Sequence, residues 1–542
     1  MNAPRNRPPG PGRDRRAVAV PAPAGRPTAG DRPPTVAVLG GGLAGVAAAT
    51  ALAERGVRVT LLEREPVLGG RLAGWPIRLS DGSTATMSRG FHAFFRQYYN
   101  LRALLRRVDP ALAGLTPLPD YPLWHGAGAR DGFARLPRTP PWNALGFAAL
   151  SPSFPARELA RLDLPAALDL LDVRVPEVYR RLDGVSASRL LDRVRFPEPA
   201  RHLAFEVFSR SFFADPDQLS AAEMALMFHI YFLGSSEGLL FDVPRAPYPQ
   251  AIWEPLAAHL TAHGARLRPA TEARAVHPVE RAGVEVVTAG GAERFDAVVL
   301  ALDTAGLTRL VANSPALGDA DWRARIGRLR PAPPFLVSRL WLDRPVAPDR
   351  PGFLGTAGFG GLDNVSVLER WEDEAARWSA RTGGSVVELH SYAVPPTVDR
   401  AAHQAELRAR LAAVYPETAD AVARDEAHLW RDDCPLFPVG GWADRPTVTT
   451  ADPRVVLAGD LVRCDLPVAL MERATSTGLL AANALLARWG LAGHPLWTVP
   501  TRGRTRALRA LAALAARRRA GEGPGTRPGT GRHPKPTVRR GR

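Results

Sequence analysis

The sequence predicts an α/β fold built around a Rossmann-like dinucleotide-binding domain. Two observations carry this prediction. A strand–helix–strand unit with the glycine pattern G-x-G-x-x-G begins at residue 35, and a short strand with a Gly-Asp pair at residues 459–460 precedes a long helix near the C-terminus. Helical and strand-like segments occur throughout the chain between these two signals, so both element types contribute to the fold.

The first unit is TVAVLGGGLAGVAAATALAERGVRVTLLERE, residues 35–65. Residues 36–39 form its first predicted strand. Gly40 permits a tight turn, Gly42 lets a pyrophosphate approach backbone N–H groups at the helix N-terminus, and Gly45 lets the helix lie close to the strand. The uncharged run 35–53 is long enough to resemble a membrane span, but the glycine spacing favours a dinucleotide site.

The second predicted strand, residues 57–62, ends at Glu63, about twenty residues after the glycines, where a carboxylate can accept hydrogen bonds from ribose hydroxyls. The stretch LGGR, residues 68–71, follows, and Arg71 can supply a charge-assisted contact to the same diphosphate. This arrangement resembles the superfamily of FAD-dependent amine oxidases and carotenoid desaturases, which are GR2-type flavoproteins. The resemblance implies bound FAD with its flavin at a domain junction.

The C-terminal signal is RVVLAGDLVRCDLPVALMERATSTGLLAANALLARWG. A strand at 455–457 leads to Gly459 and Asp460, and a helix is expected over about 468–489. In flavoproteins of this type the Gly-Asp pair lies by the ribityl-phosphate end of FAD. The N-terminus of the helix then faces the flavin pyrimidine ring, where it stabilises negative charge. Met471 and Glu472 match the Met-Glu pair of that family.

The resemblance implies that an α+β substrate domain is interleaved with a discontinuous FAD-binding domain. The segment 264–304 resembles the part of the family that returns to the nucleotide domain and covers the adenine, with Ala273 as the expected backbone contact. We expect the following division: a disordered basic tail, 1–34; the FAD-binding domain, 35–115, 255–310 and 430–495; the substrate domain, 116–254 and 311–429; and a basic C-terminal tail with a short amphipathic helix, 496–542.

Two further stretches indicate the branch of the superfamily. GFHAFFRQYYNL, residues 90–101, and DDCPLFPVGGWADRP, residues 432–446, resemble the carotene desaturases, and most of all the actinobacterial β-carotene desaturase/methyltransferases, the isorenieratene synthases. Some relatives carry an acid before Gly-Phe-His, but this chain has Ser88-Arg89, which leaves the general base unassigned. The only lysine, Lys535, lies in the C-terminal tail, which argues against an ordinary amine oxidase.

The resemblance implies an enzyme that oxidises the β-rings of β-carotene to aromatic rings while one methyl group shifts, giving an isorenieratene-type product. A cation in an apolar tunnel is best stabilised by aromatic faces, and an apolar wall excludes water. Oxygen, a quinone or another acceptor must take up the electrons. The alternatives are an acyclic carotene desaturase acting on phytoene or ζ-carotene, a carotenoid cis–trans isomerase, an amine oxidase, and a non-catalytic flavoprotein at a membrane surface.

These motifs predict the residues of the site. The expected cofactor-binding residues are Gly40, Gly42, Leu43, Ala44, Gly45, Glu63, Arg64, Gly70, Arg71, Ala273, Gly459, Asp460, Met471 and Glu472. The catalytic candidates are Arg89, Phe91 and His92, although His92 is also explained as a buried, hydrogen-bonded ring beside the flavin. The expected substrate-binding residues are Phe94, Phe95, Tyr98, His229, Phe232, Phe437 and Trp442, and Tyr231 is a further candidate for the substrate tunnel on composition. Two cysteines are too few for a thiolate metal site, and no metal is expected.

The positive charge is concentrated at the two ends of the chain. Seven arginines and two aspartates precede residue 35, whereas twelve arginines, one lysine and one glutamate follow residue 500. The rest of a chain with net charge +16 is therefore close to neutral, which argues against a nucleic-acid-binding protein. We expect a cytoplasmic protein on the inner face of the cell membrane, held there by the basic helix with Leu508, Leu511 and Leu514 or by an apolar patch in 205–242.

Overall fold

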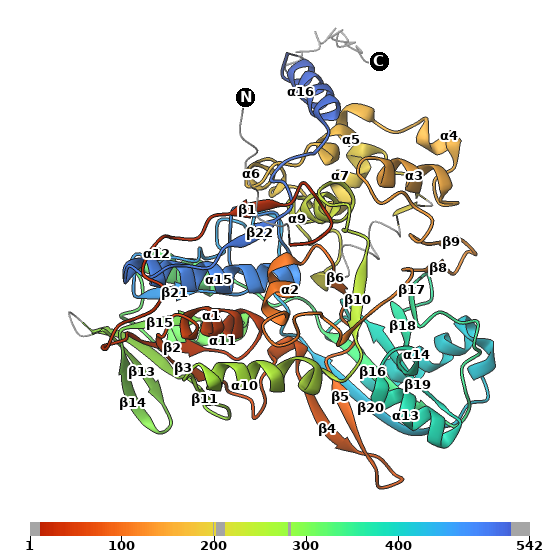
Figure 1. The fold of residues 1–542 in the computed structure, drawn as a ribbon. Helices are drawn as coiled ribbons and strands as arrows, with labels where there is room; N and C mark the ends of the chain where they lie inside the picture. The colour runs from red at the N-terminus through yellow and green to blue at the C-terminus, as the bar shows by residue number, and fades with distance from the viewer. Residues whose placement is uncertain (1–10, 199, 202–211, 280–282, 522–542) are drawn as a thin grey trace, which may run out of the picture.

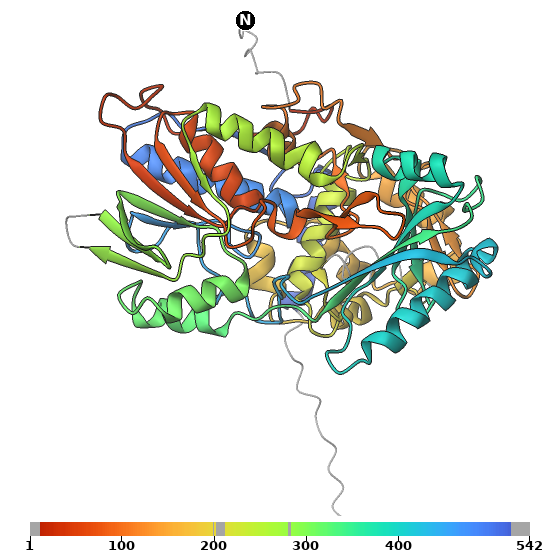
Figure 2. The ribbon, with the colours of Figure 1, turned by 90° about the horizontal axis from the view of Figure 1, so that it is seen from below.

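A computed structural model places two large β-sheets side by side, with a cluster of helices beyond one end of both (Figures 1 and 2). The structure describes residues 11–198, 200–201, 212–279 and 283–521. Within these ranges every helix is too short or too polar to span a bilayer.

The first sheet is parallel and five-stranded, and its central strands are largely apolar because other elements cover both faces. Its order is β11 (Arg266–Arg268), β3 (Arg58–Leu62), β2 (Thr35–Leu39), β15 (Ala297–Leu300) and β21 (Val455–Leu457). One face packs against α1 (Leu43–Ala53), α10 (Glu254–Ala262) and α15 (Leu470–Arg488). Every residue of α1 is buried, which explains its alanine-rich sequence.

The opposite face of this sheet is covered by a three-stranded antiparallel sheet and two helices. These elements are β12 (Ala275–Val279), β13 (Gly283–Thr288), β14 (Gly291–Phe295), α11 (Thr304–Ala312) and α12 (Ala320–Arg328). Ile326 of α12 shares a core with Val455 of β21. The predicted boundary at residue 310 is therefore too early, because the chain stays with the nucleotide sheet until it enters the second sheet.

The second sheet has seven strands and is mixed. Its order is β20 (Ala423–Arg431), β16 (Phe335–Leu342), β19 (Ser385–Ser391), β18 (Asn364–Val367), β17 (Phe353–Ala357), β8 (Leu123–His125) and β9 (Arg130–Asp131). One face packs against α14 (Arg400–Val414). The other packs against α13 (Asp373–Thr382) and the hairpin of β4 (Gly74–Arg78) and β5 (Thr84–Ser88).

The junction between the two sheets is made by the segment after β5. A small antiparallel sheet has the order β6 (Phe94–Phe95), β10 (Phe241–Pro244) and β7 (Leu115–Pro117), and α2 (Tyr99–Leu105) follows β6. The helical cluster above it comprises α3 (Trp142–Leu150), α4 (Ala156–Leu159), α5 (Leu164–Leu171), α6 (Glu177–Leu182), α7 (Ala187–Val194), α9 (Ala221–Phe228) and the π-helical turn η4 (His229–Leu233).

The prediction of a disordered N-terminal tail is wrong for residues 11–34. Strand β1 (Val18–Val20) pairs with β22 (Leu496–Thr498), and Asp14 forms a buried ion pair with Arg504 at 2.8 Å. Specific pairing between the two ends of the chain thus overrides a composition that is typical of linkers. The predicted C-terminal helix is present as α16 (Arg506–Gly521), while residues 1–10 and 522–542 lie outside the described residues.

Candidate active site

A single cavity of about 730 Å³ runs from the first sheet to the second. At one end it is lined by the glycine-rich turn after β2, by the end of β3 and by the segment after β21. At the other end it is walled by aromatic side chains from β6, β16, β17 and the helical cluster. The elements that carry the sequence motifs therefore meet the aromatic segment in one continuous space.

The glycines of the first turn fit a dinucleotide. Gly40 has a φ of +109°, and a Cβ on Gly45 would collide with the carbonyl oxygen of Gly40, so both must be glycine for α1 to lie close to β2. At Gly42 a Cβ would be in ordinary contact with the second glycine motif, 3.9 Å from the Cα of Gly70. The two glycine motifs of the sequence thus lie against each other, and Gly42 and Gly70 both line the same end of the cavity.

Glu63 lies buried at the end of β3 and lines the cavity. Its carboxylate accepts hydrogen bonds from the backbone N–H of Gly41 at 2.6 Å and from that of Glu65 at 2.8 Å. Arg64 and Ala273 line the same end of the cavity. A carboxylate fixed by backbone donors is held in place to accept hydrogen bonds from a ribose.

Arg71 and Asp460 join the second glycine motif to the Gly-Asp pair, although they are far apart in sequence. The guanidinium of Arg71 donates to the Asp460 carboxylate at 2.5 Å, and both residues line the cavity. Burial opposes the charge of Arg71, but Asp460 outweighs this and raises the Arg71 pKa above its usual value. Gly459 has a φ of +146° and donates its backbone N–H to Thr477 of α15 at 2.9 Å.

The N-terminus of α15 faces the cavity, where Leu470, Met471 and Ala474 contribute to the lining. Leu470 has a φ of +52°, an unusual conformation for a leucine, at the first residue of the helix. Glu472, however, is turned away from the cavity. Its carboxylate accepts the backbone N–H groups of Asn100 at 2.8 Å and Leu101 at 3.0 Å, so it caps α2 and does not face a cofactor.

Most of the residues expected to bind the cofactor therefore border one space, which fits the diphosphate, ribose and ring of FAD. The residues that line it are Gly40, Gly42, Leu43, Ala44, Glu63, Arg64, Gly70, Arg71, Ala273, Gly459, Asp460 and Met471. Gly45 acts from outside it by close packing, and Glu472 acts on α2. No group of three or more His, Cys, Asp or Glu side chains that could hold a metal ion occurs among the described residues.

A second cluster of charged side chains is buried where α9, α15 and the segment before β21 meet. Glu223 of α9 accepts from Arg473 at 2.7 Å and from Arg445 at 2.5 Å, and all three side chains are at most 4% exposed. Arg445 lies over the rings of Phe437 and Trp442, at 4.6 and 4.9 Å. The prediction that these two aromatic residues bind substrate is therefore not kept, because they pack on a buried guanidinium away from the cavity lining.

The segment from Ser88 to Asn100 supplies one wall of the cavity. Phe91, Phe95 and Tyr98 line it, and the Phe91 ring stacks on Phe353 at 4.2 Å. Phe94 is fully buried on the opposite side of β6, in the core under α1 and α2, so its predicted contact with substrate is a wrong prediction. The alternation along a strand explains why neighbouring phenylalanines serve different surroundings.

The catalytic candidates Arg89 and His92 both reach the cavity. Arg89 is paired with Asp433 at 2.5 Å and lies over the Phe335 ring. His92 places Nδ1 2.9 Å from the Gly90 carbonyl oxygen, and burial lowers the His92 pKa to about 4. His92 is therefore neutral near pH 7, with its Nδ1–H donated to the backbone.

Of the three residues of η4 considered as substrate contacts, only Tyr231 lines the cavity. His229 is fully buried and its Nε2 bonds the Pro500 carbonyl at 2.8 Å, while Phe232 packs within the helical core, so neither lines the cavity. Tyr231 does line it, and its hydroxyl lies 2.7 Å from that of Tyr98.

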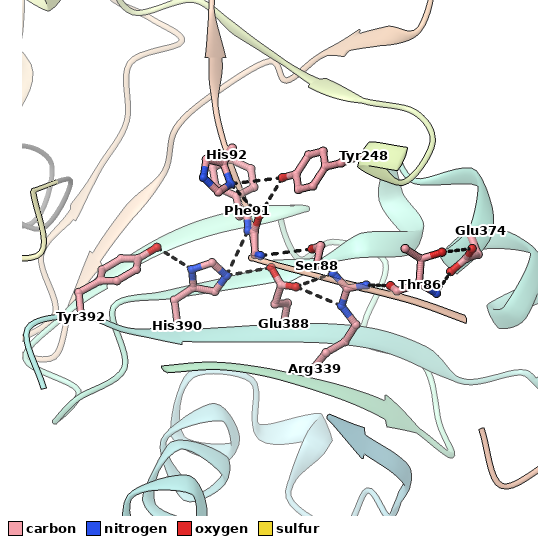
Figure 3. Close-up of polar contacts among 11 residues, drawn as sticks. Thr86, Ser88, Phe91, His92, Tyr248, Arg339, Glu374, Glu388, His390 and Tyr392 are labelled. Atoms are coloured by element: carbon pink, nitrogen blue, oxygen red, sulfur yellow. Dashed lines mark hydrogen bonds and ion pairs between the residues drawn. The ribbon is translucent and has the colours of Figure 1, made fainter. Parts of the chain in front are cut away.

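A buried polar chain on the second sheet was missed entirely in the sequence. Arg339 of β16 donates to Glu388 at 2.7 Å, Glu388 contacts His390 Nε2 at 2.8 Å, and His390 Nδ1 lies 2.6 Å from the Tyr392 hydroxyl (Figure 3). His390 and Tyr392 line the cavity. The available signal was ELHSY, where three polar side chains alternate along an apolar strand and so share one face.

Comparisons with known proteins place the chain among flavoproteins. A family model described as flavin containing amine oxidoreductase matches residues 43–486. A carotenoid phi-ring synthase of Streptomyces griseus is 68% identical over 504 residues, covering 93% of this chain and 98% of that protein. A carotenoid phi-ring synthase of Chlorobaculum tepidum is 27% identical, covering 87% and 91%. The solved structure of cyclohexylamine oxidase from Brevibacterium oxydans shares the fold, with a TM-score of 0.63, 16% identity and coverage of 84% and 99%.

Proposed function

Because the chain belongs to the carotenoid desaturase branch of the flavin-containing amine oxidoreductases, we propose that it acts on the rings of β-carotene. It is an FAD-dependent oxidoreductase that modifies carotenoids. The proposed reaction converts each β-ring into an aromatic ring with a methyl shift. The names of the two phi-ring synthases support a reaction at the ring, and hence a product of the isorenieratene type.

The observation that carries this proposal is the continuity of the cavity. Its dinucleotide end, at Gly42 and Arg71, leads without a partition to walls that are largely aromatic. The walls include Phe91, Phe95, Tyr121, Phe133, Phe335 and Phe353. Aromatic faces of this kind suit an apolar ring.

The proposed chemistry asks specific things of these side chains. Bound FAD supplies the two-electron oxidation, and each ring must lose two hydride equivalents and two protons while every carbon is kept. The aromatic faces stabilise the cation from which a methyl group migrates, and the apolar wall keeps out the water that would trap it. Oxygen or a quinone is the proposed acceptor of the electrons.

Expression in a host that makes β-carotene tests the proposal. We expect the carotenoid profile to change to products with one and two aromatic rings. Hosts that make phytoene, ζ-carotene or lycopene serve as parallel arms. Desaturation of an acyclic carotene, or only a change in cis–trans ratio, would replace the proposal by one of the alternatives, and no change with FAD bound would count against all of them.

We further propose that the protein docks on the inner face of the cell membrane through one end of the helical cluster. Large apolar side chains are exposed on α3, α5 and α16, which lie together at one end of the molecule (Figure 1): Trp142, Leu145, Leu150, Leu164, Leu511 and Leu514, each 49–65% exposed. Arg157 and Arg161 of the same region are 80% and 71% exposed. Exposed apolar side chains together with exposed arginines suit an anionic bilayer surface.

This surface is also close to the cavity. Phe147 of α3 packs against Phe133 at 5.2 Å between ring centres, and Phe133 lines the cavity wall. The other predicted membrane contact, an apolar patch in 205–242, is not kept for residues 212–242, which are mostly buried in the helical core; residues 205–211 lie outside the described residues. A substrate that leaves the bilayer at α3 would thus meet the aromatic wall directly.

The double variant Trp142→Ser/Leu511→Ser is expected to bind vesicles containing phosphatidylglycerol at least about tenfold more weakly than wild type, since burying one such side chain contributes about 1.5–3 kcal/mol. Co-sedimentation measures the affinity. Val422→Ser is the matched control. Val422 is 60% exposed and immediately precedes β20, which lies away from α3, α5 and α16 (Figure 1). Equal binding by wild type and the double variant would contradict the proposed docking.

A further inference from the structure

We propose that Tyr392, backed by His390 and Glu388, is the general base that removes a proton from the substrate cation. The inference rests on the proposed function and adds to it the residue that the sequence left unassigned. Figure 3 shows the three side chains in a line, from Arg339 on one side to Tyr392 on the other.

Glu388, the most deeply buried of the three side chains, is a carboxylate that stays ionised in the protein interior. Glu388 is fully buried, and burial would raise its pKa, but the charge of Arg339 and the hydrogen bond from His390 outweigh burial and lower it to about 2. Arg339 also donates to the hydroxyl of Ser88 at 2.9 Å and to the Thr86 carbonyl. The carboxylate is therefore anchored to β5, immediately before the aromatic segment.

The contacts of His390 fix which nitrogen carries the proton. Nε2 lies 2.8 Å from Glu388 Oε1 and 3.3 Å from the backbone N–H of Phe91, and it cannot donate to one and accept from the other at once. The shorter contact with a carboxylate assigns the proton to Nε2. Nδ1 is then a lone-pair acceptor that points at the Tyr392 hydroxyl, 2.6 Å away.

Gly90 makes room for this imidazole. A Cβ on Gly90 would lie 2.5 Å from Cε1 of His390, and Gly90 has a φ of +92° that disfavours other residues. The glycine of the Gly-Phe-His motif is thus explained by a histidine three hundred residues further along the chain. The aromatic wall and the polar line are built together.

Tyr392 is the member of the line that meets substrate. It is partly exposed and lines the cavity, whereas His390 is 1% exposed behind it. Its hydroxyl donates to His390 Nδ1 and accepts from Asn364 Nδ2 at 3.0 Å, which leaves one lone pair on the oxygen. Burial raises the Tyr392 pKa above its usual value, so the phenol is neutral before the reaction.

The proton step balances on these groups. The C–H bond beside the cationic carbon breaks, its electron pair becomes the new C=C bond, and its proton goes to the phenol oxygen of Tyr392. The phenol proton passes to His390 Nδ1, and the resulting imidazolium is stabilised by the Glu388 carboxylate. A C–H bond next to a cationic carbon is strongly acidic, so a neutral phenol coupled to an imidazole is a sufficient base.

The test compares Tyr392→Phe with wild type as purified, FAD-loaded protein given β-carotene in phosphatidylcholine vesicles. We expect Tyr392→Phe to keep its FAD content and its quenching of tryptophan fluorescence by carotenoid, and to form product about 10²–10⁴-fold more slowly. His390→Gln should lose a similar factor, and the double variant no more than either single variant, because the residues act as one unit. Tyr415→Phe is the matched control and should keep the wild-type rate. Tyr415 is buried in the core between the second sheet and α14.

A second readout does not depend on turnover. In ¹⁵N spectra of histidine-labelled protein, the signals that vanish in His390→Gln should be those of an Nε2–H tautomer. The inference is overturned if Tyr392→Phe forms product at close to the wild-type rate, or if His390 carries its proton on Nδ1. If wild type oxidises ζ-carotene or lycopene but not β-carotene, the proposed ring reaction fails while the same comparison still decides the role of Tyr392. If it oxidises none of them, both fall.

Discussion

The variant Gly42→Val is expected to fold normally and to bind no FAD. A Cβ at Gly42 meets no atom closer than 3.9 Å, and the backbone there is extended with a φ of −80°, so we expect the apoprotein to tolerate the valine. The new side chain would nevertheless project beside Gly70 into the end of the cavity that both glycine motifs line, where the diphosphate is expected to bind. Flavin absorbance of the purified variant and titration with FAD measure the effect, and circular dichroism checks the fold.

The matched control is Gly327→Val, since Gly327 is exposed on α12 and a Cβ there meets nothing within 4 Å. This control should bind FAD as wild type does. Gly42→Val with wild-type FAD content would mean that the diphosphate does not bind against the two glycine motifs. An unfolded Gly42→Val would contradict the expectation that the apoprotein tolerates this side chain.

The variant Glu223→Gln is expected to lower the free energy of unfolding by about 3–5 kcal/mol, because it leaves the buried guanidinium groups of Arg473 and Arg445 without their carboxylate. Chemical denaturation measures the loss. Since Arg473 also donates to the Asp460 carbonyl at 3.3 Å, we expect weaker FAD binding as well. Glu177→Gln is the control: its pair with Arg180 is exposed and should contribute no more than about 1 kcal/mol.

The same cluster has a defined dependence on pH. Burial would raise the Glu223 pKa, but Arg473 and Arg445 outweigh burial and lower it below its ordinary value of 4.5. The unfolded chain therefore takes up this proton first as the pH falls. The stabilising contribution is fully present above about pH 4.5 and is lost as the pH falls through the lower pKa of Glu223 in the folded protein. The difference in free energy of unfolding between wild type and Glu223→Gln should therefore become smaller in acid. A difference that is unchanged down to pH 3 would contradict an ionised Glu223.

Local sequence patterns were sufficient to predict the elements and lining residues at the dinucleotide end of the cavity. The strand, the three glycines and Glu63 form one continuous unit whose geometry depends on neighbouring residues, so reading them in order places them correctly in space. The Gly-Asp pair and the helix after it are a second such unit. What joins the two, the ion pair of Arg71 with Asp460, follows once both are assigned to the same sheet.

The rest depends on which strands become neighbours, and a single sequence does not reveal that. Glu388 stays ionised because β16 places Arg339 opposite it, and Phe437 and Trp442 pack on Arg445 and do not line the cavity. Glu472 matched the family motif by position, yet its carboxylate points to α2. Side-chain direction at a helix end is decided by tertiary packing, and composition likewise failed for the N-terminal segment that pairs with β22.

The proposed membrane-docking surface and the cavity would together form a path for a carotenoid. Trp142 would lie at the bilayer end of this path. Phe133, Tyr392 and Arg71 all line the cavity, with Arg71 at its dinucleotide end. A polyene is long and thin, so its ring can reach the reacting groups while the rest of the chain remains in the aromatic wall.

The structure of the product made from β-carotene by purified, FAD-loaded enzyme is the most direct measurement of the proposed function. Mass spectrometry should show that each converted ring has lost four hydrogen atoms and no carbon, and proton NMR should show aromatic hydrogens with one ring methyl moved to the adjacent carbon. A product with unaltered β-rings, whether it is further desaturated in the chain or only isomerised, would contradict the proposed reaction.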